Sequence, residues 1–323
     1  MEPALRLSGV TKTFGQTIAV QQMDLEVPRG ALYGVIGPNG AGKTTCIRMI
    51  MSILFPDQGE LSVLGHRSAL DAKDRIGYLP EERGVYRKMR VGAFLTYVGR
   101  LKGLSAGESA ARGQHLLERV KLPDTIDRRC EDLSKGMLQR VQIAAAIIHQ
   151  PDLLILDEPF TGLDPVSVRL LRELILEEHH RGTTILFSTH AMAHAEELCQ
   201  HVVMIHRGRK VLDEPTAALR RRFDSRTIRF EPLDPSSSLD LVRALPTVES
   251  VRGSDNGYDI TLVPGADPVA AMHAVTGLIP VARIELARLR LDDIFIGLVS
   301  DADATREQLR ASLQALSVEG ATA

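Results

Sequence analysis

Residues 31–45 read ALYGVIGPNGAGKTT, and this stretch decides the fold. Its first part is an apolar run that ends at Ile36, which predicts a strand buried on both faces. The glycine-rich part matches the pattern G-x-x-x-x-G-K-[ST] without departure, and a helical pattern begins at Lys43. A strand, a glycine-rich loop and a helix in this order predict a phosphate-binding loop.

The loop has the composition that phosphate binding requires. Glycines let consecutive backbone N–H groups turn toward phosphate oxygens, and the helix that follows points its positive end at the same anion. We expect Lys43 to reach the outer phosphates and the Thr44 hydroxyl to bind Mg²⁺. The predicted nucleotide-binding residues of the loop are Gly37, Pro38, Asn39, Gly40, Ala41, Gly42, Lys43, Thr44 and Thr45.

A second motif, LLILDE at residues 153–158, has four apolar residues followed by two acids. Ligands of open α/β sheets bind at the carboxyl ends of the strands, so the two acids should lie near the phosphate-binding loop. We expect Asp157 to contribute to the Mg²⁺ shell. We expect Glu158 to act as the general base, or to position water, for attack on a γ-phosphate.

Residues 1–214 alternate between strand and helix patterns, which predicts an α/β fold with a parallel sheet. Residues 17–27 and 59–65 alternate apolar and polar side chains and predict a smaller antiparallel layer. Residues 82–150 hold three helical patterns with little strand signal, which predicts a helical insertion. The apolar runs that mark the sheet are 31–37, 153–156, 184–187 and 202–205.

The pattern changes near residue 213. Residues 226–300 read as strand, helix, strand, strand, helix and strand, an order that predicts a small ferredoxin-like α+β domain. We expect residues 215–225 to form the linker to it. Residues 301–323 read as a tail with one possible helix.

Composition narrows the class of protein. The 323 residues carry a net charge of −2, so no global electrostatic footprint for nucleic acid exists, and no nucleic-acid partner is expected. Three scattered cysteines favour a reducing compartment over a disulfide framework. No window approaches the 18 apolar residues of a membrane span, so any membrane role should depend on a partner.

Three more motifs follow in order: 133-LSKGMLQR, 161-TGLDP and 188-STH. Together with 37-GPNGAGKTT and 153-LLILDEP, they resemble the nucleotide-binding subunit of an ABC transporter over about residues 4–214. The first looks like the signature loop of that family, usually LSGGQ, and the others look like its D-loop and switch histidine. The resemblance implies a P-loop NTPase fold that binds ATP and Mg²⁺ and hydrolyses ATP.

The resemblance also implies roles for single residues. Two subunits would face each other head to tail, and Ser134 and Gly136 would contact the γ-phosphate held by the other copy. Asp164 would lie at the dimer interface. His190 would sense the γ-phosphate and help to orient water, and Phe14 would stack on adenine.

Three positions depart from the family pattern. Glu81 stands where the family commonly has Gln, a residue that touches Mg²⁺ and couples the site to the membrane partner. A carboxylate can also bind Mg²⁺. Lys135 replaces the first of two glycines, and Met137 replaces a Gln. Because Ser134 and Gly136 are kept, we still expect hydrolysis.

A narrower resemblance rests on 78-YLPEERGVY, 134-SKGM and a C-terminal domain that ends in 291-LDDIFIGLV. These features are similar to the branch that works with ABC-2-type permeases, including sodium and drug exporters. The implied protein is an exporter's motor subunit, held at the cytoplasmic face of the cell membrane. Its partners would be a second copy or a close relative and a multi-span permease, which would dock on the helical insertion at 82–150.

Other functions fit the sequence less well. ABC-type ATPases that act on ribosomes or DNA usually have two cassettes, or coiled-coil or zinc insertions, and this chain has neither. A P-loop kinase or GTPase would leave 133-LSKGM and 188-STH unexplained. A nucleotide-gated module with little hydrolysis is suggested by Glu81. A zinc site is disfavoured because His190 has a better role; its other ligands would be His194, Cys199 and His201.

Overall fold

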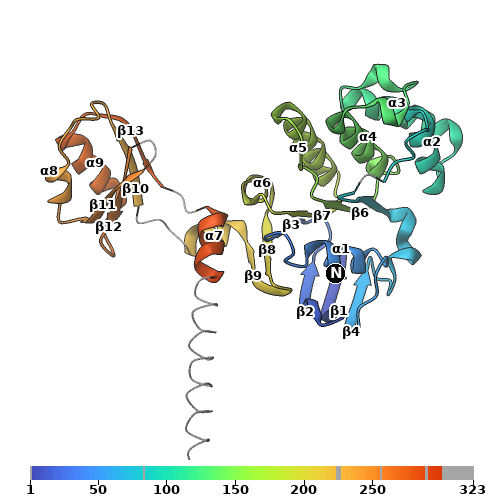
Figure 1. Ribbon diagram of the computed structural model, residues 1–323, viewed down its shortest axis with the longest axis horizontal. Coiled ribbons are helices and arrows are strands. Elements are labelled where there is room, and N and C mark those ends of the chain that lie inside the picture. The colour runs from blue at the N-terminus through green and yellow to red at the C-terminus, as the bar shows by residue number, and fades with distance from the viewer. Residues whose placement is uncertain (1, 83, 223–226, 255–256, 288–289, 300–323) are drawn as a thin grey trace, which may run out of the picture. The chain divides into compact units, whose positions relative to one another are not determined.

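The computed structural model describes residues 2–82, 84–222, 227–254, 257–287 and 290–299 (Figure 1). It divides into two compact units, one up to Thr216 and one from Ala217, and each has its own apolar core. The tail at 301–323, for which one helix is predicted, lies outside the described residues.

A six-stranded sheet forms the centre of the first unit. Its strands are parallel except for the last, which runs antiparallel to its neighbour. The three strands at its centre are buried at every position, as runs without polar residues predict. In order across the sheet, the strands are β5 (Ile76–Leu79), β6 (Leu153–Asp157), β7 (Thr184–Thr189), β3 (Leu32–Ile36), β8 (His201–His206) and β9 (Arg209–Pro215).

This strand order brings distant motifs together. β7 lies between β6 and β3, pairing Asp157 with Ser188 and Ile36 with Thr189. Because all three strands are parallel, their carboxyl ends meet at one edge of the sheet. The phosphate-binding loop therefore lies beside Asp157, the last residue of β6, and Glu158, which follows it.

The antiparallel layer has three strands, in the order β2 (Thr17–Val27), β1 (Leu5–Phe14) and β4 (Gln58–Val63). The sequence predicts β2 and β4 but not β1. The signal that could have predicted β1 is its alternation of apolar and polar residues. Leu5, Leu7 and Val10 are buried, while Arg6 and Ser8 are exposed. Figure 1 shows this layer and helices α2–α4 on opposite sides of the central sheet.

The predicted helical insertion is present. It consists of α2 (Val91–Leu101), α3 (Ala106–Arg119) and α4 (Lys135–Ile147). Serine residues cap two of these helices: the Ser105 hydroxyl accepts from Glu108 N–H, and the Ser134 hydroxyl accepts from Met137 N–H. The sequence therefore encodes where α3 and α4 begin.

The remaining helices of this unit connect the strands. α1 (Lys43–Ile50) follows β3, α5 (Pro165–His180) follows β6, and α6 (Met192–Leu198) follows β7. Three short 3₁₀ helices span Ala69–Arg75, Pro123–Thr125 and Cys130–Asp132.

The second unit has a four-stranded antiparallel sheet in the order β11-β12-β10-β13. Its strands and helices follow one another as β-α-β-β-α-β, and an apolar core lies between the sheet and its helices. They are β10 (Thr227–Pro232), α8 (Asp240–Arg243), β11 (Val248–Ser254), β12 (Gly257–Leu262), α9 (Pro268–Leu278) and β13 (Val281–Leu286). A further helix covers residues 291–299.

Much of the segment expected as a linker is helical. Within residues 215–225, α7 spans Thr216–Arg222, and residues 223–225 lie outside the described part of the chain. The run TAALRRR consists mainly of strong helix formers, and Pro215 ends the preceding strand. The helix propensity of these seven residues therefore decides their structure, although their polar composition is typical of a linker.

Candidate nucleotide site

The phosphate-binding loop needs glycine where the backbone passes close to its neighbours. A Cβ atom on Gly37 would lie 2.2 Å from the carbonyl oxygen of Ile205, and one on Gly42 would lie 2.4 Å from that of Ala19. Gly42 also has φ +108°, which favours glycine. The loop is therefore packed directly against the backbones of β8 and β2.

A hollow of about 460 Å³ opens over this loop. It brings the loop together with Glu81 and Glu158, which lie far away in the sequence. Its lining residues are Thr17, Ile18, Ala19, Asn39, Gly40, Ala41, Gly42, Lys43, Thr44, Thr45, Glu81, Glu158 and Arg207.

Lys43 lies at the floor of the hollow and is only 5% exposed. Its ammonium group donates to the carbonyl oxygens of Gly37 (2.8 Å) and Pro38 (3.2 Å) and lies 3.4 Å from Glu158 Oε1. Loop carbonyls and a buried carboxylate therefore hold the cation in place. It can meet a phosphate without first being ordered, which lowers the entropy cost of binding.

Asp157 is fully buried at the end of β6. Its Oδ1 accepts hydrogen bonds from the hydroxyl groups of Thr44 (3.3 Å) and Ser188, while its Oδ2 is buried without a protein partner. Burial raises the pKa of Asp157, and these two hydrogen bonds oppose the rise. A divalent cation would satisfy Oδ2 and offset the buried charge, so a carboxylate and a hydroxyl at this point fit Mg²⁺.

Glu158 follows directly and has a left-handed backbone, with φ +50°. Its N–H donates to the Ser188 hydroxyl (3.1 Å), and its Oε2 lies 2.9 Å from His190 Nδ1. The Thr161 hydroxyl donates to the same Oε2 at 3.4 Å. His190 and Thr161 hold one carboxylate oxygen while Lys43 faces the other, so the carboxylate lies beside the loop in a fixed orientation suited to a base.

Glu81 is exposed, lines the hollow and follows β5 at the same edge of the sheet. Its negative charge contributes to the raised pKa of Asp157. Phe14 ends β1 and is 48% exposed, with its ring 5.6 Å from Lys12 Nζ. It does not line the hollow, but it pairs in register with Thr17, which does. Stacking on adenine stays a prediction.

Ser134, Gly136 and Asp164 form a separate cluster outside their own chain's hollow. A Cβ on Gly136 would lie 3.7 Å from Asp164 Oδ2, so the starts of α4 and α5 are adjacent. Asp164 caps α5 by accepting from the N–H groups of Val166 and Ser167 and from the Ser167 hydroxyl. These bonds lower the pKa of Asp164, first of all the bond from the Ser167 hydroxyl.

Sequence reasoning missed several contributors to the site. Ser188 bonds both Asp157 and Glu158, although only its motif, 188-STH, is singled out from the sequence. Arg207 enters the hollow through the tight turn between β8 and β9, where Gly208 N–H donates to Ala41 O at 2.8 Å. The available signal is an Arg-Gly turn just after the apolar run at 202–205.

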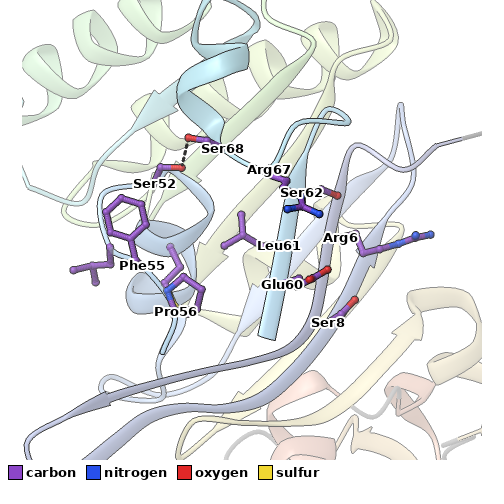
Figure 2. A pocket seen from close by; sticks show the side chains of 12 residues that line it. Arg6, Ser8, Ser52, Phe55, Pro56, Glu60, Leu61, Ser62, Arg67 and Ser68 are labelled. Atoms are coloured by element: carbon purple, nitrogen blue, oxygen red, sulfur yellow. Dashed lines mark hydrogen bonds between the residues drawn. The ribbon is translucent and has the colours of Figure 1, made fainter. Parts of the chain in front are cut away.

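A second hollow, of about 400 Å³, lies by the antiparallel layer (Figure 2). Ser52 and Ser68 are hydrogen-bonded across it, with Phe55 and Pro56 nearby and Arg6 at the opposite end. It contains none of the predicted site residues.

Two properties of the described residues bear on other functions. No helix among them combines the length and apolar character that crossing a bilayer requires. They also contain no group of three or more His, Cys, Asp or Glu side chains that could hold a metal ion. The histidines considered for zinc instead have separate partners: His190 contacts Glu158, and His201 contacts Asp213 and stacks on Tyr33.

Comparison with known proteins gives the family. A family model described as ABC transporter matches residues 20–161. The uncharacterized ABC transporter ATP-binding protein YhaQ of Bacillus subtilis (strain 168) is 38% identical over 296 residues, which cover 90% of this chain and 97% of the relative. The daunorubicin/doxorubicin resistance ATP-binding protein DrrA of Streptomyces peucetius is 33% identical over 305 residues, covering 91% and 92%.

A solved structure of the ATP binding subunit of an ABC transporter superposes with a TM-score of 0.63 at 32% identity. It covers 68% of this chain and 93% of its own. The YhaQ and DrrA matches extend over nearly the whole of both chains, and the superposed structure has the same fold. The chain therefore belongs to the family of ABC transporter ATP-binding subunits, which bind ATP with Mg²⁺ and hydrolyse it.

Proposed function

We propose that this chain is the motor subunit of an exporter, and that Glu158 activates water for ATP hydrolysis. The observation that carries the proposal is the Glu158 carboxylate, 6% exposed, held between Lys43 and His190 at the edge of the phosphate-binding loop. A carboxylate held in this way can accept a proton from water that attacks the γ-phosphate. His190 would keep it oriented.

The residues around the loop would divide the remaining work. Lys43 and the backbone N–H groups of the loop would bind the phosphates, and Thr44 and Asp157 would hold Mg²⁺. That ion supplies charge neutralisation on the phosphate oxygens. Glu81, which also lines the hollow, would reach the same ion or its water.

The position of the remaining site residues supports a dimer. Ser134, Gly136 and Asp164 lie together outside their own chain's hollow. A second copy or a close relative, facing head to tail, would bring the exposed start of α4 onto the nucleotide. Subunits of this family work as dimers with membrane permeases, and the proposal is that this arrangement applies here.

The surface between the Glu81 loop and the helical insertion is suited to a permease. A hollow of about 220 Å³ lies there, lined mainly by aromatic and apolar side chains. Tyr86, 56% exposed, and Tyr97 form an edge-to-face pair with ring centroids 5.4 Å apart. Exposed tyrosines over an apolar hollow favour a protein partner. Attachment there would place the chain at the cytoplasmic face of the membrane.

The direction of transport is proposed from the relatives. DrrA is named for resistance to daunorubicin and doxorubicin, and a transporter confers resistance by carrying the compound outward. That match spans 305 residues and so continues past Thr216 into the second unit. We therefore propose an ABC-2-type permease as the partner.

The proposed role of Glu158 is tested by measuring phosphate release from ATP with the wild type and with Glu158→Gln. We expect the variant to retain ATP binding and to lose roughly 100-fold or more in kcat, because the base is removed while the loop is intact. Equal rates in the two proteins would refute the assignment of Glu158.

Purification from native membranes in a mild detergent tests the partner. A multi-span protein should accompany the chain, and Tyr86→Ala combined with Tyr97→Ala should weaken that association. Recovery with ribosomes or DNA instead would support a soluble ATPase and contradict the exporter proposal.

A further inference from the structure

The start of α4 is fastened to the segment that follows Glu158 in the same chain. The Gln139 side-chain amide donates to the carbonyl oxygen of Pro159 at 3.3 Å. One turn earlier, the Lys135 side chain lies over Gly162. A Cβ placed on Gly162 would be 2.3 Å from Lys135 Nζ and 2.9 Å from its Cε.

The backbone that receives these contacts is under strain. Glu158 has φ +50°, a conformation that costs a non-glycine residue about 1 kcal/mol or more and persists only when its surroundings hold it. On its N-terminal side, two acceptors on Ser188, the hydroxyl and the carbonyl oxygen, take the Glu158 N–H. On its C-terminal side, the next residue is Pro159, which has no N–H of its own.

The contacts from α4 therefore support that side from outside the turn, next to the packing of the Phe160 ring on Phe187. Thr161 bonds back to Glu158 through both its N–H and its hydroxyl, which closes a tight turn. Gln139 holds the carbonyl at the beginning of this turn, and Lys135 covers Gly162 at its end. Gly162 has φ +72° and leaves the space that the lysine stem occupies.

We propose that Gln139 and Lys135 are positioning residues for Glu158. Gln139 fixes Pro159 by a hydrogen bond, and Lys135 fixes Gly162 by the packing of its stem. Together they hold the Glu158 carboxylate in reach of His190 and Lys43. The inference rests on the proposed role of Glu158 as the group that activates water.

Substitution of Gln139 by Met tests the first contact, because Met has nearly the same shape and no N–H donor. Loss of one neutral hydrogen bond should lower kcat roughly five- to ten-fold. The KM for ATP should stay unchanged, since Gln139 is not part of the hollow. Gln114→Met is the matched control, because the Gln114 amide donates to Glu118 within α3, and it should leave kcat unchanged.

The Glu158→Gln variant distinguishes an effect of Gln139 on Glu158 from a general effect of Gln139 on the fold. If Gln139 acts through Glu158, Gln139→Met should cause no further loss in the single-turnover rate of Glu158→Gln. A further loss of similar size there would overturn the proposal. So would an unchanged kcat in the single variant.

Lys135 is tested by comparing two substitutions. Lys135→Met keeps an unbranched stem over Gly162 and should retain most of the activity, whereas Lys135→Ala should lose about two- to three-fold in kcat. Equal losses in both would mean that the charge, not the packing, matters, and would overturn the assignment for Lys135. If Glu158→Gln kept full activity, the proposed function would fail. If Glu158→Gln lost activity while Gln139→Met and Lys135→Ala kept it, this inference alone would fail.

Discussion

The two hollows of the first unit are similar in size, about 460 and 400 Å³, and differ in chemistry. The phosphate-binding hollow holds a buried lysine and a buried glutamate, with a buried carboxylate oxygen of Asp157 that lacks a protein partner close by. In the hollow of Figure 2, Ser52 and Ser68 bond each other and the backbone beside them. Volume alone therefore does not mark a functional site; incompletely satisfied buried charge does.

The largest expected difference between the hollows comes from removing one cation from each. Lys43→Ala should weaken ATP binding by about 100-fold or more, because several charge-assisted hydrogen bonds to phosphate are lost and Glu158 loses a buried partner. Arg67→Ala in the second hollow should leave the affinity unchanged. Titration with a fluorescent ATP analogue measures both. Equal affinities of the two variants for the ATP analogue would show that the two hollows do not differ in nucleotide binding.

A smaller effect is expected from Asp157→Asn. Burial raises the folded-state pKa of Asp157, so the folded chain holds this proton more tightly, and stability is lost as pH rises above the ordinary value of 3.8. The variant should therefore unfold at a Tm roughly 2–4 °C higher than wild type at neutral pH without nucleotide.

The same variant should lose the rise in Tm that Mg²⁺ and ATP give the wild type, since ligand binding stabilises the folded state. Thermal unfolding with and without Mg²⁺ and ATP tests both statements. A lower Tm for Asp157→Asn without nucleotide would contradict the claim that the ionised carboxylate is costly there.

The smallest effect concerns the second hollow. Ser52→Ala removes the hydrogen bond to Ser68 and the acceptor for Ala69 N–H, so it should lower the free energy of unfolding by about 1 kcal/mol. ATP hydrolysis at 25 °C should stay unchanged. Urea unfolding measures the free energy of unfolding, and phosphate release measures the rate of ATP hydrolysis. A loss of ATPase activity beyond the loss of folded protein would show that the two hollows are coupled.

Local motifs predict much of the fold and of the site. The strand before Gly37, the helix from Lys43 and the acids at the end of β6 follow from residues adjacent in sequence, because fully apolar runs and glycine patterns are local signals. The strands β1, β5 and β9 and the helix α7 are missed. Their segments are short or half polar, and the parts of the chain that pack against them decide their structure.

The site shows the same limit. Lys43 and Asp157 are predicted, whereas Arg207 and Gln139 are not, because their positions depend on how separate elements pack. The predicted tail at 301–323 falls outside the described residues. Roles across a dimer, such as that of Ser134, need a second chain and stay predictions.

The position of β7 links the correct register of the central sheet to nucleotide binding. Ser188 touches Asp157, and His190, two residues later, touches Glu158. A slip of one residue in β7 would turn every side chain to the opposite face and break both contacts at once. A misaligned chain would then lack both an ordered metal ligand and an oriented base. Protection against proteolysis by magnesium nucleotide would thus select correctly aligned molecules from a mixture.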